Sequence, residues 1–160
     1  MQLTEALIEQ YVEDAKIIIG RCYLSFVPPT IVKITISKAR SYWAQIKYVS
    51  GNYYELRVSN VFNEITDEHL FHKRLMSCMI HELIPTIPKC WNHGAVFKKM
   101  AALINRYYPE FDVQTGTDGG DFRGFVLVIG HDGGRAAGKE NIMASALKLA
   151  RSKPSKPKKV

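Results

Sequence analysis

The positions of its prolines constrain the fold of this 160-residue chain more than any other feature. Three segments have apolar residues at the three- and four-residue spacing of an amphipathic α-helix. This spacing predicts helices over residues 4–21, 67–83 and 95–107, approximately. Each is followed by proline, which cannot continue a helix. These prolines are Pro28 and Pro29, Pro85 and Pro88, and Pro109.

Between the first two predicted helices the apolar pattern changes to the alternation of β-strands. Residues 31–36 alternate and are rich in β-branched side chains. Residues 43–49 and 53–59 flank Ser50-Gly51-Asn52, which is a hairpin signal. The three segments predict a small antiparallel sheet. Since strands are followed by two helices without alternation, the pattern indicates the α+β class and not a wound parallel sheet.

Composition divides the chain into three parts. Residues 1–112 have the mixed composition of one packed domain. Eight of the eleven glycines lie between positions 116 and 138, so residues 113–147 are predicted to form a glycine-rich extension with a strand over 125–129 and a helix over 140–150. The last thirteen residues, 148–160, contain six basic residues and no acid, which predicts a disordered tail. The six are Lys148, Arg151, Lys153, Lys156, Lys158 and Lys159.

The charge of the chain resides mainly in this tail. Its six cations account for all but one unit of the formal net charge of +7, which argues against a nucleic-acid groove in the folded body. Four acids precede the first lysine, unlike a secretory signal, and no run approaches the ~20 apolar residues of a membrane span. Three cysteines without framework spacing are typical of a reducing compartment. We therefore expect a cytoplasmic protein.

The chemically informative residues stand at the end of the second predicted helix and after the loop that follows. In the pattern His-Glu-x-x-His, two imidazoles one helical turn apart converge on a zinc ion, and the glutamate acts as general base on the metal-bound water. His81 and Glu82 occupy the first two positions of this pattern. Position 85, where the second histidine belongs, is Pro85, and His93 follows a short loop.

Two motifs resemble the SprT-like family of zinc metallopeptidases, which is related to the Spartan proteases that cut DNA–protein crosslinks. The first is the helix from Met76 to Leu83, and the second is His93-Gly94-Ala95-Val96-Phe97-Lys98 with Ile104-Asn105 downstream. The similarity covers roughly residues 4–112, and the short spacing between the motifs is similar to compact phage or bacterial members.

The resemblance implies a zincin-like fold that hydrolyses peptide bonds of a protein substrate in the bacterial cytosol or a phage-infected host. It implies Zn²⁺ as cofactor, His81 as first ligand, His93 as third ligand and Glu82 as general acid/base. The zinc-ribbon cysteines that some members carry after this domain are absent.

Pro85 departs from the family pattern because proline has no side-chain donor for a metal and no N–H for the helix bond to the carbonyl of His81. Three interpretations remain open. The chain is a degenerate enzyme, or pseudoenzyme, that keeps the fold and a binding role, or a histidine has been replaced. Alternatively, Cys78 and Cys90 rebuild the site, because each stands three residues before one of the two histidines and four such ligands suit a closed zinc site.

The sequence thus predicts a metallopeptidase domain with low or absent activity. The alternative is a non-catalytic module that holds nucleic acid or a protein partner. For the tail of residues 148–160, about six phosphate contacts would make DNA binding strongly dependent on salt.

Overall fold

The structure is a computed structural model that describes residues 2–115 and has an α+β fold. Helix α1 (Glu5–Cys22) precedes three strands, and helices α2 (Glu68–Leu83) and α3 (Ala95–Tyr107) follow them. Short 3₁₀ helices connect or end these elements: η1 (Asn60–Glu64), η2 (Ile84–Thr86) and η3 (Pro109–Phe111). The predicted strand at 125–129, the helix at 140–150 and the basic tail lie outside the described residues.

The three predicted helices are confirmed, and their starts and ends follow from local chemistry. The side chain of Thr4 accepts a hydrogen bond from the backbone N–H of Leu7, which caps α1. Asp67 caps α2 in the same way by accepting from the N–H of Leu70 at 2.8 Å. At its other end α2 stops at Leu83, two residues before Pro85.

The sheet contains β1 (Thr30–Ser37), β2 (Ala44–Ser50) and β3 (Tyr53–Ser59) in the spatial order β1-β3-β2. The β2–β3 hairpin is antiparallel as predicted, but β1 pairs with β3 in parallel, so the sheet is mixed and the prediction of an antiparallel sheet was wrong. The hairpin turn fixes only how β2 meets β3. β1 joins the edge of β3 that the hairpin leaves free, and local sequence patterns do not encode this choice. β2 therefore lies at the opposite edge of the sheet from β1.

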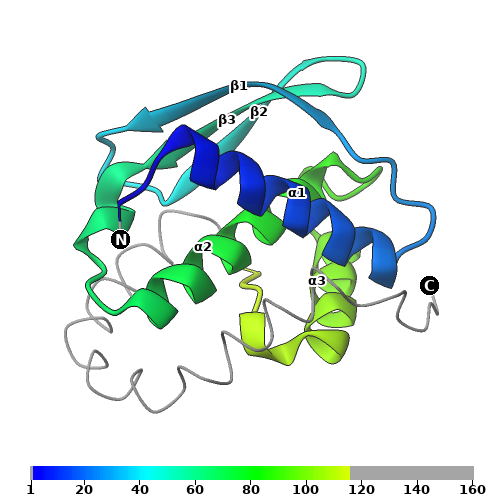
Figure 1. The fold of residues 1–160 in the computed structure, drawn as a ribbon. Coiled ribbons are helices and arrows are strands. Elements are labelled where there is room, and N and C mark those ends of the chain that lie inside the picture. The colour runs from blue at the N-terminus through cyan, green and yellow to red at the C-terminus, as the bar shows by residue number, and fades with distance from the viewer. Residues whose placement is uncertain (1, 116–160) are drawn as a thin grey trace.

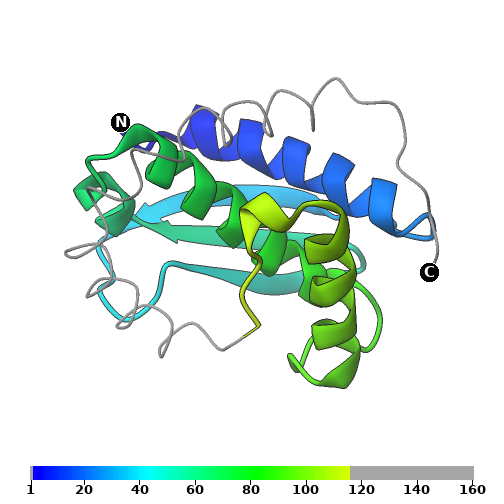
Figure 2. The same cartoon turned by 90° about the horizontal axis from the view of Figure 1, so that it is seen from below.

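Helices α1 and α2 pack against each other and cover one face of the sheet, while α3 lies near the C-terminal end of α2 (Figures 1 and 2). The hydrophobic core fills the space between the helices and this face. The opposite face carries the exposed side chains of Lys33, Lys47 and Arg57. Within residues 2–115 no helix has the length and apolar character needed to cross a membrane.

Candidate functional site

His81 and Glu82 lie in the last turn of α2, where both side chains are almost completely buried, with 5% and 4% of their surface exposed. The Nε2 atom of His81 is 3.9 Å from the carboxylate Oε2 of Glu82. A buried carboxylate is costly unless its surroundings compensate its charge, so a glutamate at this depth is a candidate functional residue.

A short loop brings His93 back to these two residues. After α2, the backbone N–H groups of Ile87, Cys90 and His93 each donate to the carbonyl three residues earlier, at 2.9 to 3.1 Å. His93 itself has a φ of 57°, in the left-handed region that residues other than glycine seldom adopt. The loop ends where the side chain of Asn92 accepts from the N–H of Gly94 at 2.9 Å, just before α3. Such strained backbone is common at binding sites.

The rings of His81 and His93 lie next to each other, and both contact the ring of Phe97. Their centroids are 5.1 Å apart, and the planes are inclined by 33°. Phe97, on the first turn of α3, is fully buried and contacts both rings, with centroid distances of 5.1 Å to His81 and 4.4 Å to His93. The structure therefore brings together two histidines that the sequence separates by eleven residues.

A backbone carbonyl determines which role Nδ1 of His81 plays. The Nδ1 atom of His81 donates to the carbonyl oxygen of Gln114 at 2.8 Å. Because a carbonyl only accepts, Nδ1 carries the hydrogen, so Nε2 is the nitrogen that can bind a metal when it is unprotonated. This is the arrangement found in metal-binding histidines, whose second nitrogen is held by a carbonyl or carboxylate.

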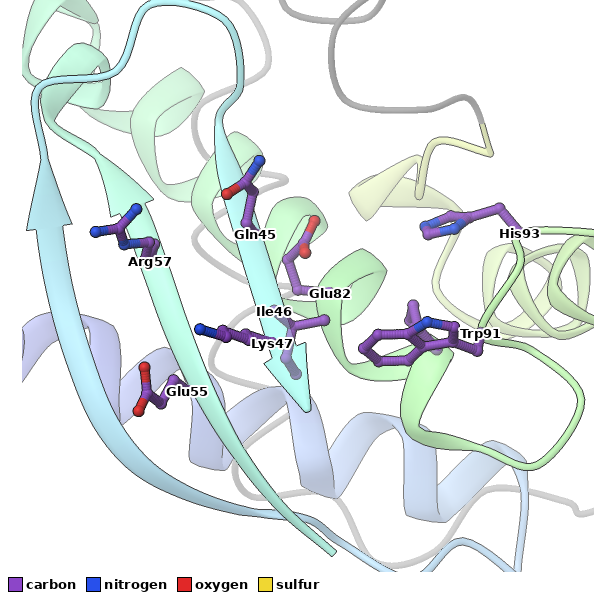
Figure 3. A pocket seen from close by; sticks show the side chains of 9 residues that line it. Gln45, Ile46, Lys47, Glu55, Arg57, Glu82, Trp91 and His93 are labelled. Carbon is purple, nitrogen blue, oxygen red and sulfur yellow. The ribbon is translucent and has the colours of Figure 1, made fainter. Parts of the chain in front are cut away.

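A cleft of about 510 Å³ opens beside these residues, along the edge strand β2 (Figure 3). Glu82, Trp91 and His93 face it from one side of the strand, and it extends around β2 to polar side chains on the outer face of the sheet. Pro85 lines the same cleft. The complete lining is Gln45, Ile46, Lys47, Glu55, Arg57, Glu82, Pro85, Trp91 and His93.

The donors in this cleft fall short of a catalytic zinc site. The separation of the two imidazole centroids suits a shared ion, because on a tetrahedral zinc with Zn–N bonds of about 2.0 Å they lie about 5 Å apart. A catalytic zinc takes three protein ligands, however, and Pro85 occupies the position of the second histidine of the pattern and has no donor for a metal. In residues 2–115 no group of three or more His, Cys, Asp or Glu side chains is placed to hold a metal ion.

The structure also fails to assemble the four-ligand alternative. Cys90 is fully buried in the hydrophobic core, and this burial raises the pKa of its thiol, which disfavours the thiolate that zinc binds. Cys78 packs against the same core from α2. Cys90 thus has the small, apolar role that buried cysteine usually has.

Some residues of the site were not predicted from the sequence. Trp91, half exposed beside the cleft, follows α2 in a loop without a recognisable motif. Gln114 contributes a backbone oxygen, which leaves no signal in a sequence. A scan against protein-family models and searches of curated proteins and of solved structures found no match to this chain.

Proposed function

We propose that this chain is a SprT-like metallopeptidase domain that holds an extended polypeptide in the cleft beside β2 and hydrolyses it slowly or not at all. The observation that carries the proposal is that Glu82 and His93 line one cleft with Pro85, while the buried His81 lies beside both of them. The resemblance assigns these three groups to the active site, and the ligand that it expects at position 85 is missing.

The orientation of His81 supports a site of metallopeptidase type. Its Nδ1 atom is engaged by the carbonyl of Gln114, and its Nε2 atom lies 3.9 Å from the glutamate that the family uses as general base. A catalytic zinc needs three protein ligands, and the natural chain offers only two imidazoles. We therefore propose no zinc-dependent step for the natural chain.

The edge strand beside the cleft supports a polypeptide as the occupant. Within residues 2–115 β2 pairs with β3 on one side only, so its other edge offers backbone N–H and C=O groups to an extended chain. Trp91 is half exposed at this cleft and provides an aromatic contact for a side chain of the ligand.

Restoring the missing ligand tests the proposal. Zinc per chain is measured by elemental analysis for the natural chain and for Pro85→His, and cleavage of an unstructured protein such as casein is followed in parallel. Pro85→His should raise both zinc content and proteolysis, because position 85 lines the same cleft as Glu82 and His93. Adding Glu82→Gln should abolish proteolysis and retain zinc, since Glu82 is assigned to the base and not to the metal.

Two outcomes contradict the proposal. One is efficient casein cleavage by the natural chain that a chelator does not stop. The other is a folded Pro85→His variant that gains neither zinc nor activity. Pro85→Ala is the matched control, because it removes the proline ring without adding a ligand.

Nucleic-acid binding by the basic tail stays a prediction, because residues 148–160 lie outside the described part of the chain. Electrophoretic mobility shift at two salt concentrations, with and without these residues, tests it. A salt-sensitive shift that truncation removes supports DNA binding by the tail. An equal shift after truncation would place any DNA contact elsewhere.

A further inference from the structure

A three-residue segment after η3 is attached to both active-site helices. We call residues 112–114 the orienting segment. Its three successive carbonyl oxygens each accept a side-chain hydrogen bond: that of Asp112 from Ser77 at 3.2 Å, that of Val113 from Asn105 at 3.0 Å, and that of Gln114 from His81 at 2.8 Å. Two of these donors belong to α2 and one to α3.

Asn105 holds the centre of the segment at two points. Its side-chain oxygen accepts from the backbone N–H of Val113 at 2.7 Å, while its side-chain nitrogen donates to the carbonyl of the same residue. The side-chain amide thus satisfies both backbone groups of Val113, as a neighbouring strand would. Val113 is also anchored by its side chain, of which only 2% is exposed.

The orienting segment has few ways to rotate between these anchors. Phe111, just before it, is fully buried in the core, and Asp112 takes a left-handed turn with a φ of 47°. Gln114 follows Val113 directly, so the direction of its carbonyl depends on the peptide that Asn105 holds. Ser77 lies one helical turn before His81, on the same face of α2, and fixes the start of the segment.

From this geometry we infer that Asn105 is a positioning residue for His81. By holding Val113, Asn105 aims the carbonyl of Gln114 at Nδ1 of His81, which keeps the hydrogen on Nδ1 and leaves Nε2 as the nitrogen that carries the lone pair. Asn105 itself touches neither the cleft nor any reacting atom, and it acts through the segment alone.

Nitrogen NMR of the isotope-labelled full chain tests this inference without a metal or a substrate. At mildly alkaline pH, where an imidazole is neutral, we expect His81 to carry its hydrogen on Nδ1. The signals of His81 are those that disappear in His81→Gln. In Asn105→Ala the ring should become a mixture of the two tautomers, because the Gln114 carbonyl is no longer held in place.

The control is Asn63→Ala. Asn63 is another partly buried asparagine, whose side-chain oxygen accepts from the backbone N–H of Leu3 at 2.7 Å, far along the chain from His81. Asn63→Ala removes a bond of the same kind and should leave the tautomer of His81 unchanged. Should Asn105→Ala not fold, Ser77→Ala replaces it, since it frees the start of the orienting segment and keeps α2 a good helix.

Two results would overturn the inference. One is a natural chain with the hydrogen on Nε2 of His81. The other is that the folded Asn105→Ala and Ser77→Ala variants both keep the hydrogen wholly on Nδ1. A second measurement rests on the proposed function: in the Pro85→His background, Asn105→Ala should weaken zinc binding roughly 10- to 100-fold, whereas Asn63→Ala should not. If Pro85→His binds no zinc, the proposed function fails while the tautomer result still decides the role of Asn105.

Discussion

Phe97 supports both histidines of the site, and its replacement should be costly for a reason that the structure makes quantitative. The ring is fully buried and lies against His81 and His93. Truncating a buried phenylalanine to alanine costs about 3–5 kcal/mol. A domain of this size has a total stability of roughly 5–15 kcal/mol, so Phe97→Ala removes a large share of it.

Urea unfolding followed by circular dichroism measures this cost. With an m-value of about 2 kcal/mol per molar urea, a loss of 4 kcal/mol lowers the midpoint by roughly 2 M. The milder Phe97→Leu keeps most of the volume but loses the ring contacts, so its midpoint should fall by about 1 M or less.

Phe71→Leu is the matched comparison, because Phe71 is also fully buried but contacts Phe62 and His72 at the other end of α2. Both leucine variants should lose stability, but only Phe97→Leu should change the ring NMR signals of His81 and His93. A midpoint shift below about 0.5 M for Phe97→Ala would refute the burial argument. Unchanged histidine signals in Phe97→Leu would refute the supporting role.

Three further predictions concern single groups outside the cleft. Asp67→Ala should lower the free energy of unfolding by about 1 kcal/mol in urea titrations, because the N–H of Leu70 loses its capping acceptor. Cys90 should resist alkylation in the native protein and react once guanidinium unfolds it, since burial raises the pKa of its thiol. Burial also raises the pKa of the Tyr108 phenol, so the stability that this neutral group contributes is present below pH 10.0 and lost as pH rises further. Tyr108→Phe should therefore reduce the loss of stability in alkaline urea titrations, and an equal loss in both proteins would contradict that assignment.

The helices were predictable because their limits are set by neighbours in the sequence. Thr4 and Asp67 cap backbone groups three residues away, and Pro85 acts on the turn that precedes it. The pairing of β1 with β3 was not predictable in this way. It depends on which edge of a distant hairpin is free, and a pattern of alternating side chains is the same in a parallel and an antiparallel pair.

In the candidate site, too, some features could be expected from the sequence and others could not. The resemblance implied that His81 and His93 share one site, and the structure places their ring centroids 5.1 Å apart, one at the end of α2 and the other just before α3. The bond from His81 to Gln114 spans 33 residues and uses a backbone oxygen, which every residue has. The resemblance included Asn105 only as part of a motif, and the two bonds to Val113 give that asparagine a physical role.

The residue at position 85 can bear on the chemistry of the site without disturbing the fold. Pro85 stands at the start of the 3₁₀ helix η2, where proline is well tolerated because the first N–H groups of a helix have no partner within it. The side chain of Thr86 donates to the carbonyl of Leu83 at 2.7 Å and so satisfies the end of α2. Exchange between proline and histidine at this position should therefore leave the core and the edge strand intact, and under the proposed function it changes the number of metal ligands. Under that proposal the chain loses hydrolysis while its cleft still holds a polypeptide.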